Sequence, residues 1–196
     1  DNVIGPEDVM GPYGVDALRQ WAAAGSSTGQ DILFNWNDVV AASRFQTKMW
    51  NIVRFSLSQI QKESPVPKTD APSTLIDRWM LANLSKTVAD VTEAMESYLF
   101  DKGLKIVRDF AWNVMADEYL EFVKGRLYSE EPERAGAVYT LETTLDAMCT
   151  MLAPYIPFFA QECYHHLSGG KRIIDHPWTT FSFEDEAALR DGDLVV

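Results

Sequence analysis

Residues Val39–Lys62, VVAASRFQTKMWNIVRFSLSQIQK, decide the fold of this chain, because they carry its clearest helical periodicity. Apolar side chains recur every three or four residues, the spacing that places them on one face of an α-helix. The members of this apolar stripe are Val39, Ala42, Phe45, Met49, Val53 and Ile60. The stretch therefore predicts a long amphipathic helix whose apolar face packs against a core.

A second face of the same helix is basic. The stretch contains no Asp or Glu, although the whole chain has a formal net charge of -12. The residues that step along this face are Arg44, Lys48, Asn51, Phe55, Ser58 and Lys62, with Arg54 at its edge. Two interpretations remain open. A basic face with an aromatic ring is typical of a local site for a polyanion, with the ring available for stacking on bases. The same pattern also fits a solvated helix surface with one partly packed ring.

Composition limits the classes of protein that this chain can belong to. With 196 residues and 46% hydrophobic content, it can bury a substantial core. A pI near 4.6 argues against non-specific binding of nucleic acid or membranes by the whole surface, so any polyanion site must be local. No apolar run approaches the roughly 20 residues of a membrane span. Two cysteines, Cys149 and Cys163, are too few for a disulfide framework, which predicts a reducing cytoplasm.

The rest of the chain is also helical in pattern. Beyond the quoted stretch, we expect helices over about 15–24, 73–99, 101–128, 133–152 and 157–167, and the quoted helix itself over 37–63 with Asn37 or Asp38 as its cap. Four helices of 20 or more residues with short connectors predict an all-α fold, an antiparallel helix bundle. The tail after residue 167 is expected to be irregular and acidic.

Candidate chemistry outside the basic face is weak. No glycine-rich phosphate loop is present. The spacing of Cys149, Cys163, His165, His166 and His176 fits no common zinc pattern, so we predict no metal site. Asp117, Glu118 and Glu121 form a paired-carboxylate candidate for acid–base catalysis, but acids on one helix are usually just solvated. From its residues alone, the chain is predicted to be a binding or structural module.

Several motifs resemble those of the valyl-tRNA synthetase family, within the class I aminoacyl-tRNA synthetases. They are Asn2–Val9 with Tyr13–Arg19 (YGVDALR), Arg44–Phe55 (RFQTKMWNIVRF), Asp77–Leu81 (DRWML), Phe110–Glu121 (FAWNVMADEYLE), Leu152–Phe158 (LAPYIPF) and His176–Trp178 (HPW). They follow the family's order over almost the whole chain, and the Lys48–Asn51 block resembles the valyl version rather than the isoleucyl or leucyl one.

The resemblance implies the anticodon-binding part of such an enzyme. It implies a short stem-contact linker after the catalytic domain over residues 1–36, a helical anticodon-binding bundle over 37–167 and a C-terminal extension over 168–196. The expected partners are the anticodon stem and loop of tRNA(Val) and the parent's catalytic domain, in a cytoplasmic monomer. The parent would ligate valine to tRNA with ATP. This piece is expected to be inactive by itself, with no cofactor of its own.

The family also implies roles for single residues. Loop readout is placed on Arg54 and Phe55, with Arg44, Lys48 and Asn51 one or two turns back, and Lys124 and Arg126 are phosphate candidates. We expect the large rings Trp50, Trp79, Trp112 and Tyr119 in the core, and Asp117 at a helix end or paired with an arginine. Two alternatives remain: the same part of an isoleucyl or leucyl enzyme, or a helical interaction module that does not bind tRNA.

Overall fold

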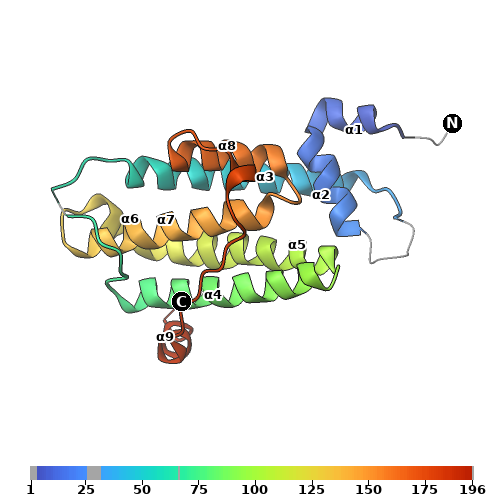
Figure 1. The fold of residues 1–196 in the computed structure, drawn as a ribbon. Helices are drawn as coiled ribbons and strands as arrows, with labels where there is room; N and C mark the ends of the chain where they lie inside the picture. The colour runs from blue at the N-terminus through green and yellow to red at the C-terminus, as the bar shows by residue number, and fades with distance from the viewer. Residues whose placement is uncertain (1–3, 26–31, 66, 196) are drawn as a thin grey trace.

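Helices make up most of the computed structural model, which describes residues 4–25, 32–65 and 67–195. Their bounds are α1 Pro6–Tyr13, α2 Val15–Gly25, α3 Trp36–Ile60, α4 Leu75–Glu96, α5 Phe100–Asp109, the π-helix η1 Phe110–Tyr119, α6 Leu120–Tyr128, α7 Glu133–Leu152, α8 Pro157–Ser168, the short 3-10 helix η2 Ile173–Asp175 and α9 Glu186–Gly192. In Figure 1, α3 and α8 lie along one side of the bundle, α4 lies along the other, and α5, α6 and α7 run between them. The described ranges contain no strand, which confirms the predicted all-α antiparallel bundle.

Helix α3 forms largely as its sequence predicts. Val39, Phe45 and Met49 of the apolar stripe are fully buried, whereas Ile60 at its end is only partly covered. The helix begins earlier than expected, because Asn35 is the cap and its side chain accepts a hydrogen bond from the Asn37 backbone N–H. The end falls at Ile60, three residues before the expected one. None of the helices in the described ranges has the length and apolar character needed to cross a membrane.

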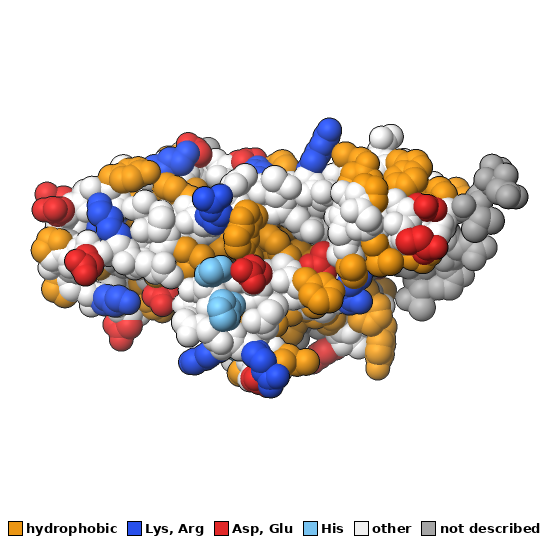
Figure 2. All heavy atoms as spheres, turned by 90° about the horizontal axis from the view of Figure 1, so that it is seen from above, with side chains coloured by type: hydrophobic (Ala, Val, Ile, Leu, Met, Phe, Trp, Pro, Cys, Tyr) orange, Lys and Arg blue, Asp and Glu red, His pale blue; other side chains and the backbone are white. Residues whose placement is uncertain are grey.

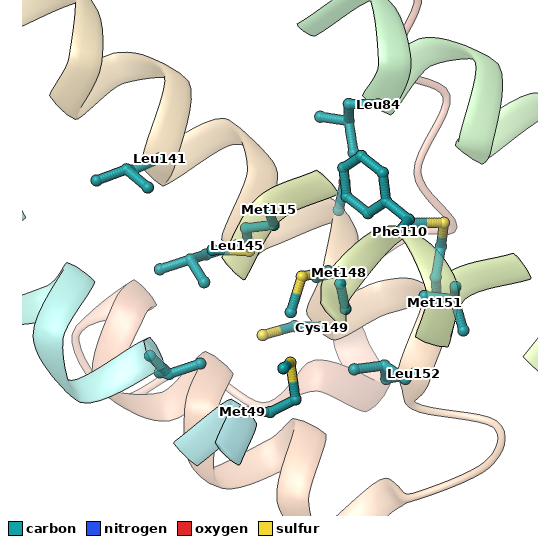
Figure 3. Close-up of a cluster of buried hydrophobic side chains, with 14 of the residues drawn as sticks. Met49, Leu84, Phe110, Met115, Leu141, Leu145, Met148, Cys149, Met151 and Leu152 are labelled. Atoms are coloured by element: carbon teal, nitrogen blue, oxygen red, sulfur yellow. The ribbon is translucent and has the colours of Figure 1, made fainter. Parts of the chain in front are cut away.

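The core lies where α7 passes through the middle of the bundle (Figure 3). Its side chains include Met49 of α3, Leu84 of α4, Phe110 and Met115 of η1, and a continuous set from α7. Most of α7 is buried on every side, so its sequence shows little alternation of polar and apolar faces. Cys149 and Cys163 belong to this core as free thiols, and their proximity together with burial raises the pKa of Cys149 well above its ordinary value.

The expected helix over 101–128 is continuous but changes type in its middle. Residues Phe110–Tyr119 form the π-helix η1, whose turns are wider than those of an α-helix. An α-helical period that continues from Leu104 and Val107 places Val114 inward, but the fully buried residue is Met115, and Val114 is only partly covered. The backbone hydrogen bonds of a π-helix span one residue more than those of an α-helix. Each inward-facing position therefore falls later in the chain than an α-helical period predicts.

The C-terminal tail is more ordered than expected, since Glu186–Gly192 forms α9 against α4 (Figure 1). Asp185 caps α9 by accepting a hydrogen bond from the Ala188 backbone N–H at 2.8 Å. The Trp79 indole N–H donates to Asp193 at 2.8 Å, and a Cβ on Gly192 would lie 2.2 Å from that indole ring. A helix this short depends on packing rather than on its own periodicity, so the pattern of the tail alone does not reveal it.

A buried carboxylate joins four elements at one end of the bundle. Asp77, with no exposed side-chain surface, is the third residue of α4 and closes a capping box with Thr74. It accepts hydrogen bonds from the Tyr119 hydroxyl at 2.8 Å and from the Arg126 guanidinium at 2.6 and 3.1 Å. Arg126 also donates to the Glu133 carbonyl at 2.7 Å. Burial beside this carboxylate raises the pKa of Tyr119 well above its ordinary value. The contacts connect α4, η1, α6 and the start of α7.

This cluster gives a prediction about stability. Asp77→Asn keeps the shape of the side chain but leaves Arg126 without a charged partner, so the free energy of unfolding should fall by about 3 kcal/mol, near the lower end for breaking a buried ion pair. Urea denaturation followed by circular dichroism measures this loss. The matched control is Glu93→Gln, which removes an exposed carboxylate from the same helix and should change stability little. Equal stability of the two variants would contradict the role given to Asp77.

Candidate nucleic-acid interface

A groove of about 640 Å³ separates α3 from η1 and α6. Its lining residues are Arg44, Thr47, Lys48, Asn51, Ile52, Phe55, Ala116, Asp117, Leu120, Glu121 and Lys124. We call it the α3–α6 groove. It brings together Arg44, Lys48, Asn51, Phe55 and Lys124 from the predicted site, although Lys124 is 69 or more residues away from the others in sequence. The groove therefore joins the basic face of α3 to one of the phosphate candidates of α6.

Lys48 is held at the edge of this groove by two contacts. Its ammonium lies 2.7 Å from a carboxylate oxygen of Asp117 and 3.6 Å from the centre of the Trp112 ring. Asp117 was expected to pin a helix end or to pair with an arginine, but its partner is this lysine. Both side chains of the pair are partly exposed, so the attraction is screened by water and contributes at most about 1 kcal/mol. An incoming anion can replace Asp117 at little cost.

The second lysine of the groove is also paired. Lys124 forms an ion pair with Glu121, three residues earlier on α6. Both side chains are about half exposed, so this pair too is open to exchange. Arg44 differs, because its exposed side chain forms no ion pair and no hydrogen bond with any of the described residues. Each basic group of the groove therefore either is free or can be released.

Phe55 offers a ring to the groove without being part of the closed core. It is half-buried, packs against the core from outside and meets the Tyr128 ring edge to face, with 6.4 Å between the ring centres. Tyr128 is itself 62% exposed. The groove floor beside Phe55 consists of Ile52, Ala116 and Leu120. A flat ring beside an apolar floor, with the Asn51 amide one turn away, is a surface on which an unstacked base can lie and be read at its edge.

Two of the predicted residues do not line the groove. Arg54 is exposed and lies outside the lining, as expected for a residue at the edge of the basic face. Arg126 is committed to Asp77, Thr74, Ser73 and the Glu133 carbonyl. Both of its terminal NH2 groups are engaged by these partners, and its Nε is buried without one. Arg126 therefore holds the fold together, which leaves Lys124 as the phosphate candidate of α6.

The sequence interpretation missed Trp112. We expected Trp50, Trp79, Trp112 and Tyr119 in the core, and Trp79 and Tyr119 are buried there, while Trp50 is partly covered. Trp112 is 37% exposed and lies under Lys48 at the edge of the groove. Trp112 belongs to the π-helix η1, in which the residues just before it, Phe110 and Ala111, are the buried ones. Such local π-helical geometry is frequent at functional sites, but an α-helical reading of the sequence does not find it.

The three acids considered for acid–base chemistry do not converge. Asp117 pairs with Lys48, and Glu121 pairs with Lys124. Partial burial, followed by the nearby charges of Asp193 and Asp117, raises the pKa of Glu118 above its ordinary value. In the part of the chain that the structure describes, no group of three or more His, Cys, Asp or Glu side chains is arranged to hold a metal ion. The groove offers ion pairs and a ring rather than an acid–base pair.

Figure 2 views the molecule from the α3–α8 side and shows how its charges are distributed. Lys and Arg side chains on this face are scattered among acidic and uncharged ones, as expected for a chain with a net charge of -12. Hydrophobic side chains gather toward the α1–α2 end. A polyanion therefore finds no broad basic field on this face, and any affinity must come from local groups.

Curated relatives of this chain are valine–tRNA ligases. Those of Methanosarcina mazei and Archaeoglobus fulgidus are 50% and 45% identical to it over 99% of its length, and that of Natronomonas pharaonis is 39% identical over 99%. The chain spans only 23%, 23% and 22% of these three proteins.

A solved structure and a family match complete the comparison. The structure is that of LeuRS from Agrobacterium radiobacter K84 agnB2 in a ternary complex with tRNA and LeuAMS. It superposes with a TM-score of 0.70 at 17% identity, covering 96% of this chain and 22% of that one, which supports the fold. Residues 77–196 match the family described as the anticodon-binding domain of tRNA ligase. Because this match extends over more than half of the chain, the protein belongs to the family of tRNA ligase anticodon-binding domains.

Proposed function

We propose that this chain is the part of a valine–tRNA ligase that holds the anticodon stem and loop of tRNA(Val). The observation that carries the proposal is the α3–α6 groove, which gathers a ring, an amide and three cations on a chain whose net charge is -12. Family membership and the valine–tRNA ligases among its relatives support the choice of tRNA. The likeness to LeuRS concerns the fold and does not favour leucine.

Different residues of the groove would contact different parts of the RNA. Phe55 accepts the face of an unstacked base, and the Asn51 amide, with one donor group and one acceptor, reads a base edge. Arg44, Lys48 and Lys124 meet phosphates, which position the loop without carrying sequence information. Arg54, at the rim, reaches the loop from outside the groove. Since Lys48 and Lys124 each exchange an internal carboxylate for a phosphate, binding should be modest and sensitive to salt.

The remaining steps belong to the rest of the parent protein. Valine and ATP would be used by its catalytic domain, to which residues 1–36 would connect as a stem-contact linker. The bundle over 37–167 and the extension over 168–196 would place the tRNA so that its acceptor end reaches that distant site. We further propose that the parent acts in the cytoplasm as a monomer and that this chain needs no cofactor of its own.

Binding of three tRNAs tests this function. In a filter-binding series, transcripts of valine tRNA should bind more tightly than isoleucine or leucine tRNA, and Arg54→Ala should narrow the difference. Preference for isoleucine or leucine tRNA would indicate a sister enzyme instead. Equal affinity for all three would contradict anticodon readout and favour a module that has lost this role.

The ring of Phe55 gives a second prediction. Phe55→Ala should cost about 1–3 kcal/mol of tRNA binding, the range for losing a base–aromatic stack. Because Phe55 is only half-buried, the free energy of unfolding should fall by less than the roughly 3–5 kcal/mol of a core Phe truncation. Phe158→Ala, which removes a 67% exposed ring from α8, is the matched control and should leave binding unchanged. A strongly destabilised Phe55→Ala that still discriminates anticodons would contradict the assignment.

The Lys48–Asp117 pair predicts a substitution that strengthens tRNA binding. Asp117→Asn removes a negative charge from the groove and releases Lys48, so tRNA binding should tighten by up to about fivefold at low salt, equivalent to about 1 kcal/mol. Lys48→Gln should weaken the binding of valine tRNA and of anticodon-swapped tRNA by the same factor. The control is Asp70→Asn, the same charge change at an exposed carboxylate of the connector between α3 and α4. Weaker binding by Asp117→Asn would show that the pair itself, rather than free Lys48, serves the tRNA.

A further inference from the structure

A second groove lies along α5, on the other side of Trp112. Its volume is about 580 Å³, and its lining residues are Ala24, Phe45, Asp101, Lys102, Leu104, Lys105, Arg108, Asp109, Trp112 and Asn113. We call it the α5 groove. It contains none of the residues that the sequence analysis or the family resemblance assigned to tRNA, and it offers three cations to a ligand.

The three cations share one face of α5. Lys102, Lys105 and Arg108 follow one another at intervals of three residues, so they stand one above the next along the helix. The opposite face carries Gly103, Leu104 and Val107 into the core. The two lysines are exposed, whereas Arg108 is partly buried, with its guanidinium carbon 5.2 Å from the centre of the Phe45 ring. The core therefore fixes the direction in which this row of charges faces.

These cations differ from Lys48 and Lys124 of the α3–α6 groove in having no counter-ion in contact. Within the described ranges, no ion pair and no side-chain hydrogen bond involves Lys102, Lys105 or Arg108. Asp101 and Asp109 line the same groove, but neither makes such a contact with the three. By contrast, Lys48 and Lys124 are each paired. Within the described ranges, the α5 groove therefore presents three cations that no carboxylate contacts.

The lack of a contacting carboxylate matters most for Arg108, because this cation is partly buried. Burial lowers its pKa below the ordinary value, with Asp109 opposing that effect, yet a guanidinium stays charged at neutral pH. The Arg108 guanidinium has lost hydration, and the nearby charge of Asp109 and the Phe45 ring replace it without a hydrogen bond. An anionic oxygen placed in the groove would restore that loss, and a guanidinium suits phosphate by donating two parallel hydrogen bonds.

The two grooves adjoin at the Lys48–Trp112 contact. Trp112 lines the α5 groove, Lys48 lines the α3–α6 groove, and the ammonium sits 3.6 Å above the indole ring. A polyanion lying in the α3–α6 groove can therefore extend past the ridge formed by the Lys48–Trp112 contact and reach the cations of α5. Phe45, which lines the α5 groove, belongs to α3, the helix that also carries the other site.

We propose that the α5 groove binds backbone phosphates of the same tRNA, through Lys102, Lys105 and Arg108, as a second contact that does not depend on sequence. This inference rests on the proposed function, since it assumes that RNA lies in the α3–α6 groove. Backbone phosphates are the ligand that the geometry favours, because the cations form a row rather than a closed pocket and continue an RNA surface across a shared ridge. An acidic protein segment is the competing occupant.

The test compares two double variants with equal charge. Lys102→Gln/Lys105→Gln removes the two exposed lysines of the α5 groove and leaves Arg108, which packs on Phe45, in place. Lys86→Gln/Lys171→Gln removes two exposed lysines on α4 and after α8, outside both grooves. Affinities of the 196-residue chain for valine tRNA and for an anticodon-swapped transcript are measured over a range of salt, and thermal melts establish that both variants fold.

The α5 double variant should bind both transcripts about tenfold more weakly at low salt, by the same factor, so that anticodon preference is kept. Its slope of log K against log salt should flatten by about 1.4–1.8, the loss of two phosphate contacts. The control should change affinity less than twofold.

Equal effects of the two double variants, or an α5 variant with unchanged affinity and slope, would overturn the inference while the proposed function stands. The second result is also the one expected if an acidic protein segment occupies the groove. A chain that binds no tRNA at all would overturn both proposals, and it is recognised by the behaviour of the unaltered protein.

Discussion

The buried carboxylate of Asp77 is the constraint on which the binding surface depends. It receives the Arg126 guanidinium and the Tyr119 hydroxyl while its own helix begins around it. Tyr119 ends η1, and Arg126 lies in α6, so the carboxylate sets the position of both elements relative to α4. These two elements form the wall of the α3–α6 groove that faces α3. A polar cluster at one end of the bundle thus helps to position one wall of this groove.

This arrangement explains why the sequence predicted the elements better than the site. The stripe of α3 was readable because one face of a long helix is buried and the other is not. Lys124 and Arg126 are basic residues two positions apart on the same short helix. The contact of Arg126 with Asp77, 49 residues earlier, distinguishes this structural arginine from the surface lysine. Long-range pairing of that kind leaves no periodic signal in the sequence.

The π-helix is the second reason. A sequence read with an α-helical period assigns Val114 to the core, whereas η1 buries Met115. The general tendency of large rings beside an apolar stripe to pack in the core misplaces Trp112, which lies at the surface between two grooves. Helix α9 was missed for a related cause. Its seven residues hold their shape through Trp79 and Asp193 rather than through a pattern of their own. Where tertiary contacts determine local geometry, propensity alone gives the wrong face.

The two grooves differ in whether their lysines are already paired with carboxylates, and this difference suits them to different parts of tRNA binding. In the α3–α6 groove, Lys48 and Lys124 are already paired, so each phosphate gained there replaces an internal carboxylate and the net gain is small. Under the proposed function, discrimination therefore falls to Phe55, Asn51 and Arg54, whose contacts would depend on which base is presented. In the α5 groove, Asp101 and Asp109 line the wall but neither contacts the three cations, so under the further inference a phosphate bound there displaces no ion pair and attracts any tRNA alike. An acidic chain can in this way keep readout and attachment apart. Under these proposals, the two lysines nearest the bases are paired with carboxylates, which limits their attraction for any RNA. The unpaired cations of α5 lie beyond the Lys48–Trp112 contact, where they would strengthen binding without reading sequence.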